Sequence, residues 1–275
     1  MAKTAHLKRW LTSIIALPLL ILLIVKGGTL LFALLIGLVT VAALWEYYRI
    51  AGVPASGRGG AWLPVLGYAT GCGIIWGAFK GSFGIMLGFV VLDFFAAAAG
   101  SLKRFSSDAA VSGHIIRQFF GSVYVPVLLS SLVLIRNGVE GIPWIFMLLG
   151  VVFAGDVAAY YVGTYLGRHK LCPAISPGKT IEGAFGGLAG NLLIGSLFKS
   201  FFLPQLPWLL SLLCFACLGL MAQAGDLFES ELKRAGKVKD SGVILPGHGG
   251  ILDRIDALLF AAPLAYIFKE FLLKV

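Results

Sequence analysis

The sequence predicts an all-α, polytopic integral membrane protein with about nine transmembrane helices (eight to ten) and a cytoplasmic N-terminus. Of its 275 residues, 59% are hydrophobic and only 13% are charged, and the mean hydropathy is +0.92. Soluble domains carry roughly 25% charged residues, so this composition excludes an ordinary soluble domain. Runs approaching the roughly 20 apolar residues that cross a bilayer recur along the whole chain.

The first expected span, near residues 11–25, follows three basic residues and resembles a signal peptide. It lacks a small-x-small cleavage site before Lys26-Gly-Gly, so we expect a retained anchor. The other eight spans are expected near residues 29–50, 61–79, 82–100, 119–135, 143–166, 181–203, 206–228 and 252–273.

Acidic residues divide the chain into two regions. The N-terminal half holds few charges within its spans, and Glu46 and Asp93 are the exceptions. Charge next to hydrocarbon is costly, so acids in spans indicate a functional site or a buried pair. We therefore expect a transmembrane scaffold over 1–140 and a catalytic region over 141–275. Acids in or at the ends of spans in that second region are Asp156, Glu182, Asp226, Glu229, Asp253 and Asp256.

The basic residues predict the orientation in the membrane. With the N-terminus in the cytoplasm, 6 of the 22 Lys and Arg residues lie outside, Arg254 lies at a helix mouth, and the other 15 lie inside. This excess follows the positive-inside rule. It places the polar segment 229–251 on the cytoplasmic face, where nucleotides are found. The six outside residues are Lys26, Lys80, Arg136, Lys199, Lys269 and Lys274.

The densest polar cluster spans residues 239–256. Asp253 and Asp256 are three residues apart, so their carboxylates share a helix face and suit a divalent cation such as Mg²⁺. The preceding loop, Pro246–Gly250, exposes backbone N–H groups and leads into a helix N-terminus, a favourable anion site. The alternative is structural: a helix cap and intrahelical ion pairs.

Two further groups of acids lie in spans. Asp226 and Glu229 share a helix face, and Glu229 and Lys233 form an i, i+4 pair, although a solvated helix end is the alternative. Asp156 shares a face with Tyr160, and a site role and a structural hydrogen bond remain equally open for this acid.

The segment Ser176–Gly183 contains Gly178-Lys179-Thr180, which superficially resembles a nucleotide-binding loop. Its leading glycine would be Ala174 and we expect no strand before it, so we reject a P-loop. A phosphate-binding Lys179 beside a helix start remains plausible, and the alternative is a loop lysine that only reflects topology.

Taken together, these motifs resemble the phosphatidate cytidylyltransferase (CDP-diacylglycerol synthase) family. The family's signature is matched by Ser230-x-Leu-Lys-Arg-x4-Lys239-Asp-x-Gly-x2-Leu-Pro-x-His248-Gly-Gly-Ile-x-Asp253-Arg-Ile-Asp256. The Asp156–Arg168, Ser176–Gly183 and Gly225–Ser230 segments match its other landmarks in order. The family often has a second lysine where Gly178 stands and an aromatic residue where Ile181 stands. Over 1–140 only the hydropathy profile is similar.

The resemblance implies transfer of a cytidylyl group from CTP to phosphatidic acid, giving CDP-diacylglycerol and pyrophosphate. It also implies a homodimer, Mg²⁺, and a monovalent cation such as K⁺, with no nucleic acid partner. We expect Asp226, Asp253 and Asp256 to bind metal and to act in catalysis with Arg254 and His248. Residues expected to bind substrate are Lys179, Thr180, Lys233, Arg234, Lys239, Gly249 and Gly250.

Two other functions remain open from the residues alone. A secondary transporter would also carry intramembrane acids and glycine-rich helices, but near the midplane of both halves, whereas here charge collects at helix ends of one half. A CTP-dependent lipid or polyprenol kinase would release CDP instead of pyrophosphate.

Overall fold

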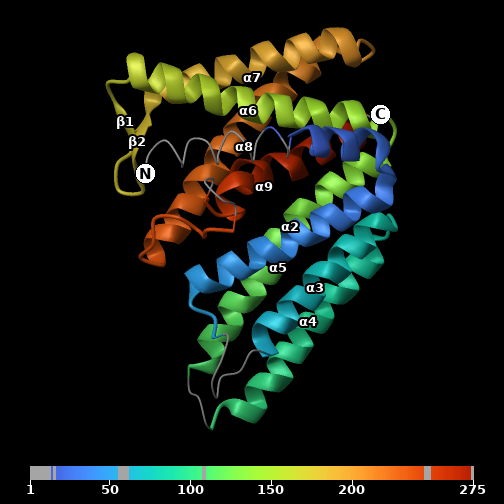
Figure 1. The fold of residues 1–275 in the computed structure, drawn as a ribbon, viewed down its shortest axis with the longest axis vertical. Helices are drawn as coiled ribbons and strands as arrows, with labels where there is room; N and C mark the ends of the chain where they lie inside the picture. The colour runs from blue at the N-terminus through green and yellow to red at the C-terminus, as the bar shows by residue number, and fades with distance from the viewer. Residues whose placement is uncertain (1–13, 15–16, 55–61, 107–109, 245–248, 274–275) are drawn as a thin grey trace. The chain divides into compact units, whose positions relative to one another are not determined.

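The computed structural model describes residues 14, 17–54, 62–106, 110–244 and 249–273. Within these ranges, seven helices are long and apolar enough to cross a membrane. They confirm seven of the nine expected spans (Figure 1): α2 (Gly28–Ala51), α3 (Trp62–Phe79), α4 (Phe83–Arg104), α5 (Val111–Asn137), α6 (Gly141–Tyr165), α7 (Ile181–Phe202) and α8 (Trp208–Ala235).

The first and last expected spans are not among these seven helices. Leu17–Lys26 is a short apolar helix in the first. In the last, α9 (Leu252–Ile267) continues into a six-residue π-helix, Phe268–Leu273. Residues 11–13, 15 and 16 of the first span lie outside the described residues, and α9 with the π-helix covers 252–273, so the expected count of nine is not confirmed.

A small β-hairpin departs from the all-helical expectation. β1 (Lys170–Cys172) pairs antiparallel with β2 (Ser176–Thr180), with Lys170 opposite Thr180. We expected no strand before Ala174, and this was wrong, because β1 lies there; Lys179 itself lies in β2. The strands have three and five residues, too short to show an alternating pattern. The hairpin leads directly into α7.

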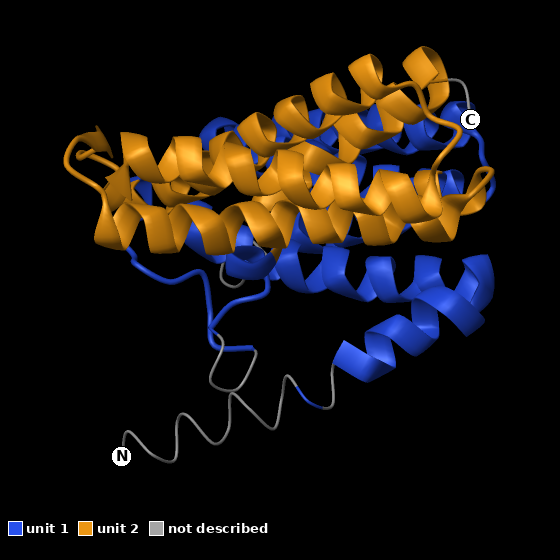
Figure 2. Cartoon of the chain, turned by 90° about the horizontal axis from the view of Figure 1, so that it is seen from above, with its two compact units in different colours: residues 1–134, 235–254 blue, residues 135–234, 255–275 orange. Residues whose placement is uncertain are grey.

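The chain folds as two compact units, coloured separately in Figure 2. Unit 1 comprises residues 1–134 and 235–254, and unit 2 comprises residues 135–234 and 255–275. The first boundary falls near residue 140, where we divided the sequence, but segment 235–254 groups with the N-terminal helices. Gly236 permits this grouping, because an added Cβ there would lie 2.6 Å from the Ile50 carbonyl oxygen.

Buried polar side chains of unit 1 form a hydrogen-bond network between its helices. Asp93 is 1% exposed, and its carboxylate accepts hydrogen bonds from Gln118 Nε2 at 3.0 and 3.3 Å. The same nitrogen lies 2.7 Å from Ser122 Oγ, which lies 3.0 Å from the Tyr48 hydroxyl. Asp93 therefore has internal hydrogen-bond partners, as a buried acid requires.

In unit 2, glycines let α6 and α7 pack closely along their lengths (Figure 1). A Cβ at Gly183 would lie 2.8 Å from the Ala159 carbonyl oxygen, and one at Gly190 would lie 3.0 Å from that of Ala154. Small residues are typical where membrane helices approach so closely. This packing holds the hairpin between α6 and α7 at one end of the pair.

Candidate active site

In unit 2, a close helix crossing brings two of the predicted acids together. A Cβ at Gly225 of α8 would lie 2.5 Å from the carbonyl oxygen of Asp256 in α9. The rings of Phe228 and Phe260 pack beside this contact, with centroids 5.6 Å apart. Asp226 follows Gly225 directly in sequence, so Asp226 and Asp256 both lie where α8 crosses α9.

Asp156 of α6 joins these two acids. The charge of Asp226 acts on Asp156, and the charges of both Asp226 and Asp156 act on Asp256. Three helices thus bring three carboxylates into electrostatic range of one another. Sequence reasoning left the role of Asp156 open, and the structure places it with the predicted site acids. Such a gathering of like charge calls for positive charge nearby.

Lys179 supplies part of that charge. Its ammonium nitrogen lies 2.6 Å from Asp226 Oδ2, and the two side chains are 26% and 35% exposed. The charge of Lys179 also acts on Asp156. The hairpin therefore delivers its lysine to the acids of α6 and α8, which the sequence prediction of a phosphate-binding Lys179 did not anticipate.

The end of α8 carries the next basic residues. Lys233 Nζ lies 2.5 Å from Oε2 of Glu229, whose side chain is fully buried, so the predicted i, i+4 pair is confirmed. The charge of Lys233 also acts on Asp256. Arg234 Nε donates to the Ile175 carbonyl oxygen at 3.1 Å, which links α8 to the hairpin turn.

Two residues beside Lys179 stabilise the local fold. The Thr180 hydroxyl caps α7 by accepting from the Gly183 N–H at 3.1 Å. Glu182 accepts from the backbone N–H groups of Arg168 and His169 at 3.0 and 3.2 Å, and lies 2.6 Å from His169 Nδ1. Substrate binding by Thr180 stays a prediction.

In unit 1, Asp253 organises the start of α9. Its carboxylate accepts from the Ser241 N–H at 3.0 Å and from the Gly250 N–H at 3.1 Å. The Asp253 N–H in turn donates to the Ser241 hydroxyl at 3.3 Å. These hydrogen bonds orient the Asp253 carboxylate at the start of α9.

Glu46 of α2 binds the same segment. Its carboxylate accepts from the Ser241 hydroxyl at 2.9 Å, the Ile251 N–H at 3.1 Å and the Leu252 N–H at 2.8 Å. In the segment that we expected to bind phosphate, the N–H groups of Ile251 and Leu252 donate to Glu46 and that of Gly250 donates to Asp253. Residues 245–248 of this loop lie outside the described residues, so the phosphate site stays a prediction. The helix N-terminus does attract an anion, but the anion is Glu46.

Two glycines make this arrangement sterically possible. Gly249 has φ +85°, a left-handed conformation that side chains rarely adopt. At Gly250 an added Cβ would overlap the Ser241 hydroxyl oxygen and lie 2.6 Å from Glu46 Oε2. Both glycines are therefore explained by the loop geometry, and substrate binding through them stays a prediction.

The remaining predicted site residues are exposed or lie outside the described residues. The side chains of Lys239 and Arg254 are exposed in unit 1. His248 lies outside the described residues. Asp253 and Asp256 are one turn apart on α9, which begins in unit 1 and continues in unit 2.

A metal site is not preformed in the described part of the chain. No group of three His, Cys, Asp or Glu side chains there is arranged to hold an ion. The donor chemistry nevertheless fits a divalent cation, because Asp156, Asp226 and Asp256 interact as like charges in unit 2. In this structure Lys179 pairs with Asp226.

Sequence reasoning missed Glu46 as a site residue. Its signal was present, since it is a single acid near the end of a 24-residue apolar helix. Its partners lie about two hundred residues away in sequence, at separations of 195, 205 and 206. No local pattern can reveal contacts of that range.

Residues 7–272 match the Cytidylyltransferase family. The phosphatidate cytidylyltransferase of Staphylococcus epidermidis is 37% identical over 277 residues, covering 94% of this chain and 97% of the relative. That of Staphylococcus aureus is 35% identical over 276 residues, with the same two shares. That of Bacillus subtilis is 43% identical over 146 residues, which cover 53% of this chain and 54% of the relative.

Proposed function

The chain belongs to the Cytidylyltransferase family, and from that premise we propose how its residues carry out the reaction. The protein is a membrane nucleotidyltransferase that moves a cytidylyl group from CTP to phosphatidic acid. The products are CDP-diacylglycerol and pyrophosphate, and the reaction is a step of phospholipid biosynthesis. The observation that carries this function is the match to phosphatidate cytidylyltransferases over 94% of the chain and 97% of the relative.

The chemistry is a phosphoryl-type displacement. An oxygen of the lipid phosphate attacks the α-phosphorus of CTP, a new P–O bond forms, and the bond to the bridging α–β oxygen breaks. The electron pair leaves with pyrophosphate. Because the attacking oxygen is already anionic, the enzyme needs little base catalysis. Its task is to bring two polyanions together and to stabilise the transferring group.

We assign the binding of phosphates to the predicted basic residues. Lys179 lies in contact with Asp226, and Lys233 acts on Asp256, so each can exchange a carboxylate partner for a phosphate oxygen. Arg234, Lys239 and Arg254 are exposed at helix or loop ends, where a nucleotide can reach them. Thr180, Gly249 and Gly250 keep the substrate-binding role that we predicted for them, and His248 keeps its predicted role in catalysis.

Mg²⁺ is the cofactor we propose. Asp226, Asp253 and Asp256 keep the metal-binding role that we predicted for them. Within unit 2, Asp156 interacts electrostatically with Asp226 and Asp256. When bound, the ion screens the charge of the phosphates and polarises their oxygens. Lys179 would then be released from Asp226 to bind phosphate.

The setting of the enzyme is also part of the proposal. Seven long apolar helices and bacterial relatives make it an integral membrane protein. We propose the bacterial plasma membrane, a cytoplasmic N-terminus and a cytoplasmic active site on the basic-residue bias. By resemblance to the family we also propose a homodimer and a monovalent cation such as K⁺.

Product analysis tests the function. Purified protein in lipid–detergent micelles is given CTP and phosphatidic acid, and the soluble products are separated. We expect pyrophosphate and CDP-diacylglycerol in equal amounts. Release of CDP with a phosphorylated lipid would identify a CTP-dependent lipid kinase. Absence of turnover, with uptake of a solute by proteoliposomes, would identify a secondary transporter.

A further inference from the structure

Glu46 is a fully buried acid whose partners are all hydrogen-bond donors. Its side chain has 0% exposure, and among the described residues it pairs with no Lys or Arg. A buried carboxylate without a cation is costly unless other groups stabilise its charge. Here the donors are one hydroxyl and two N–H groups of the first turn of α9, where the helix dipole favours negative charge.

Ser241 connects Glu46 with Asp253. Its hydroxyl donates to Glu46 Oε2 at 2.9 Å, and its N–H donates to Asp253 at 3.0 Å. The Asp253 N–H returns a hydrogen bond to the Ser241 hydroxyl at 3.3 Å. The orientation of Asp253 therefore depends on a residue that Glu46 holds in place.

We propose that Glu46 is a positioning residue for cytidylyl transfer. It fixes Ser241 and the first turn of α9, and through them the orientation of Asp253. Glu46 touches no reacting atom in this role. The inference rests on the proposed function, because Asp253 is a site residue only if that function holds.

The carboxylate is chemically required at this position. Oε2 accepts from the Ser241 hydroxyl and the Leu252 N–H, and Oε1 accepts from the Ile251 N–H. An amide of the same shape keeps one acceptor oxygen and turns an NH₂ group toward donors. Glu46→Gln should therefore loosen the start of α9 without leaving a cavity.

The test combines steady-state kinetics with hydrogen exchange of the purified full-length protein. We expect Glu46→Gln to lower kcat by about 10- to 100-fold, as is typical when a residue supporting a site ligand is changed. The KM for CTP should change by less than about 3-fold, since ground-state contacts remain. Hydrogen exchange, measured without metal or substrate, should speed up in peptides covering 241 and 250–253.

The matched control is Asp93→Asn. Asp93 is also a buried acid of unit 1, but its partner is Gln118, not the segment before α9. We expect it to leave kcat within about 3-fold and exchange at 241–253 unchanged. Ser241→Ala should reproduce the kinetic effect of Glu46→Gln, and the double variant should be no worse than either single variant, because the two residues act as a unit.

Several results would overturn the inference. One is a Glu46→Gln enzyme with wild-type kcat, and another is faster exchange spread equally over α2–α5, which would indicate general destabilisation. Additive effects of Glu46→Gln and Ser241→Ala on kcat would also overturn the inference. If wild-type protein makes no CDP-diacylglycerol, the proposed function fails, and hydrogen exchange alone still tests whether Glu46 holds the segment.

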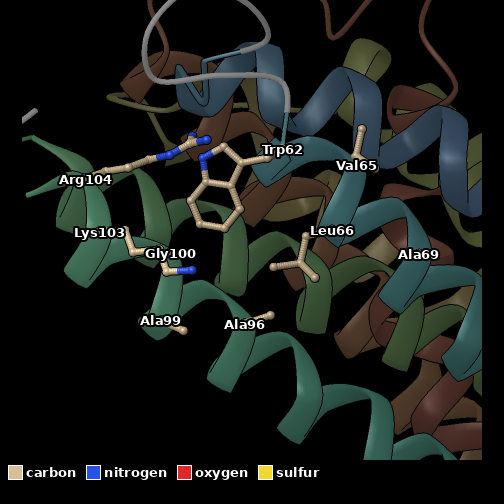
Figure 3. Close-up of a pocket in the computed structure, with 9 residues that line it drawn as sticks. All are labelled: Trp62, Val65, Leu66, Ala69, Ala96, Ala99, Gly100, Lys103 and Arg104. Carbon is tan, nitrogen blue, oxygen red and sulfur yellow. The ribbon is translucent and has the colours of Figure 1, made fainter. Parts of the chain in front are cut away.

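An independent observation concerns an apolar groove on α3 and α4 of unit 1. Its volume is about 570 Å³, and Trp62, Leu66, Ala96 and Ala99 form its walls (Figure 3). Small alanine side chains leave it open, and the basic side chains of Lys103 and Arg104 lie at one end. The Arg104 guanidinium packs over the Trp62 ring, 4.9 Å from its centroid.

We infer that the groove binds an anionic phospholipid. An apolar channel with two cations at one end matches an acyl chain joined to a phosphate headgroup, and basic pockets at the ends of membrane helices bind anionic headgroups. Arg is suited to bidentate contact with phosphate, and its stacking on Trp62 orients it. This inference does not depend on the catalytic reaction.

The test measures binding of phosphatidylglycerol to delipidated protein by native mass spectrometry, with phosphatidylcholine of the same chains as reference. We expect selective binding of phosphatidylglycerol, weakened roughly 10- to 30-fold in Lys103→Gln/Arg104→Gln because two cations are lost. Ala96→Phe, which fills the groove, should weaken both lipids. The matched control is Lys80→Gln, because Lys80 also stacks on a tryptophan, Trp76, at 4.8 Å but lies outside the groove.

Equal binding of the two lipids, or unchanged binding in the Lys103/Arg104 double variant, would overturn the lipid site. A change of oligomeric state in Ala96→Phe with lipid binding intact would also overturn it. That result would assign the groove to an interface between copies of the chain.

Discussion

Substitution of Gly225 by alanine tests how the site acids are brought together. The added Cβ would lie 2.5 Å from the Asp256 carbonyl oxygen, whereas ordinary contact begins at 3.4 Å. The backbones of α8 and α9 must therefore separate by about 0.9 Å, since 3.4 − 2.5 = 0.9. The added Cβ would also lie 3.1 Å from the Cβ of Phe260, so a change of side-chain rotamer cannot relieve the clash.

We expect Gly225→Ala to lower the catalytic rate more than it impairs folding. Overpacking of this size destabilises by about 1–3 kcal/mol. A displacement near 1 Å between site groups costs up to about 100-fold in rate. We therefore expect Gly225→Ala to insert and fold, with kcat lowered by about 10- to 100-fold. The assay follows CDP-diacylglycerol formation, together with the melting temperature of the purified protein.

Gly88→Ala is the matched control, because its added Cβ has no neighbour within 4 Å. It should keep wild-type kcat and slightly raise stability, since alanine is the better helix former by about 1 kcal/mol. A Gly225→Ala enzyme with wild-type kcat would refute the reasoning that this crossing sets the distance between Asp226 and Asp256.

The remaining predictions address the other site residues and the topology. Asp253→Asn and Asp256→Asn should each nearly abolish turnover while the protein still inserts; retention of more than about a tenth of the wild-type rate, under ~1.4 kcal/mol, would contradict their metal role. Lys179→Ala should mainly raise the KM of one substrate. Arg254→Lys should mainly lower kcat, because lysine cannot make the bidentate contact of the guanidinium with the reacting phosphates. The opposite pattern would show that the two roles are assigned the wrong way round. A cysteine introduced at Lys237 should react with an impermeant reagent only after cells are opened; labelling from outside would refute the cytoplasmic site.

Hydropathy was sufficient to predict the seven long helices, because each holds enough apolar residues to cross a bilayer. It failed for the hairpin 170–180, whose strands are too short for a periodic pattern. The last expected span, 252–273, is helical but changes from α9 to a π-helix at Phe268, which apolar composition does not predict.

The sequence predicted which residues belong to the candidate site better than it predicted the contacts among them. Asp226, Asp256 and Lys179 were identified from their residue types and positions, but their mutual contacts depend on helix packing. Asp156 joins them through electrostatic interactions with Asp226, Asp256 and Lys179. The bonds of Glu46 to Ser241 and to the start of α9 join residues about two hundred positions apart, which single-sequence patterns cannot detect.

The most direct measurement of the central claim follows the label of [α-³²P]CTP in purified wild-type protein and in the Asp226→Asn variant. We predict that wild-type protein transfers the label to a chloroform-soluble lipid in the presence of phosphatidic acid, with one pyrophosphate released for each label transferred. Asp226→Asn should lose this transfer by at least about 100-fold while it remains folded. Transfer at the wild-type rate by Asp226→Asn, or label that stays entirely in soluble nucleotide with the wild-type protein, would contradict the account.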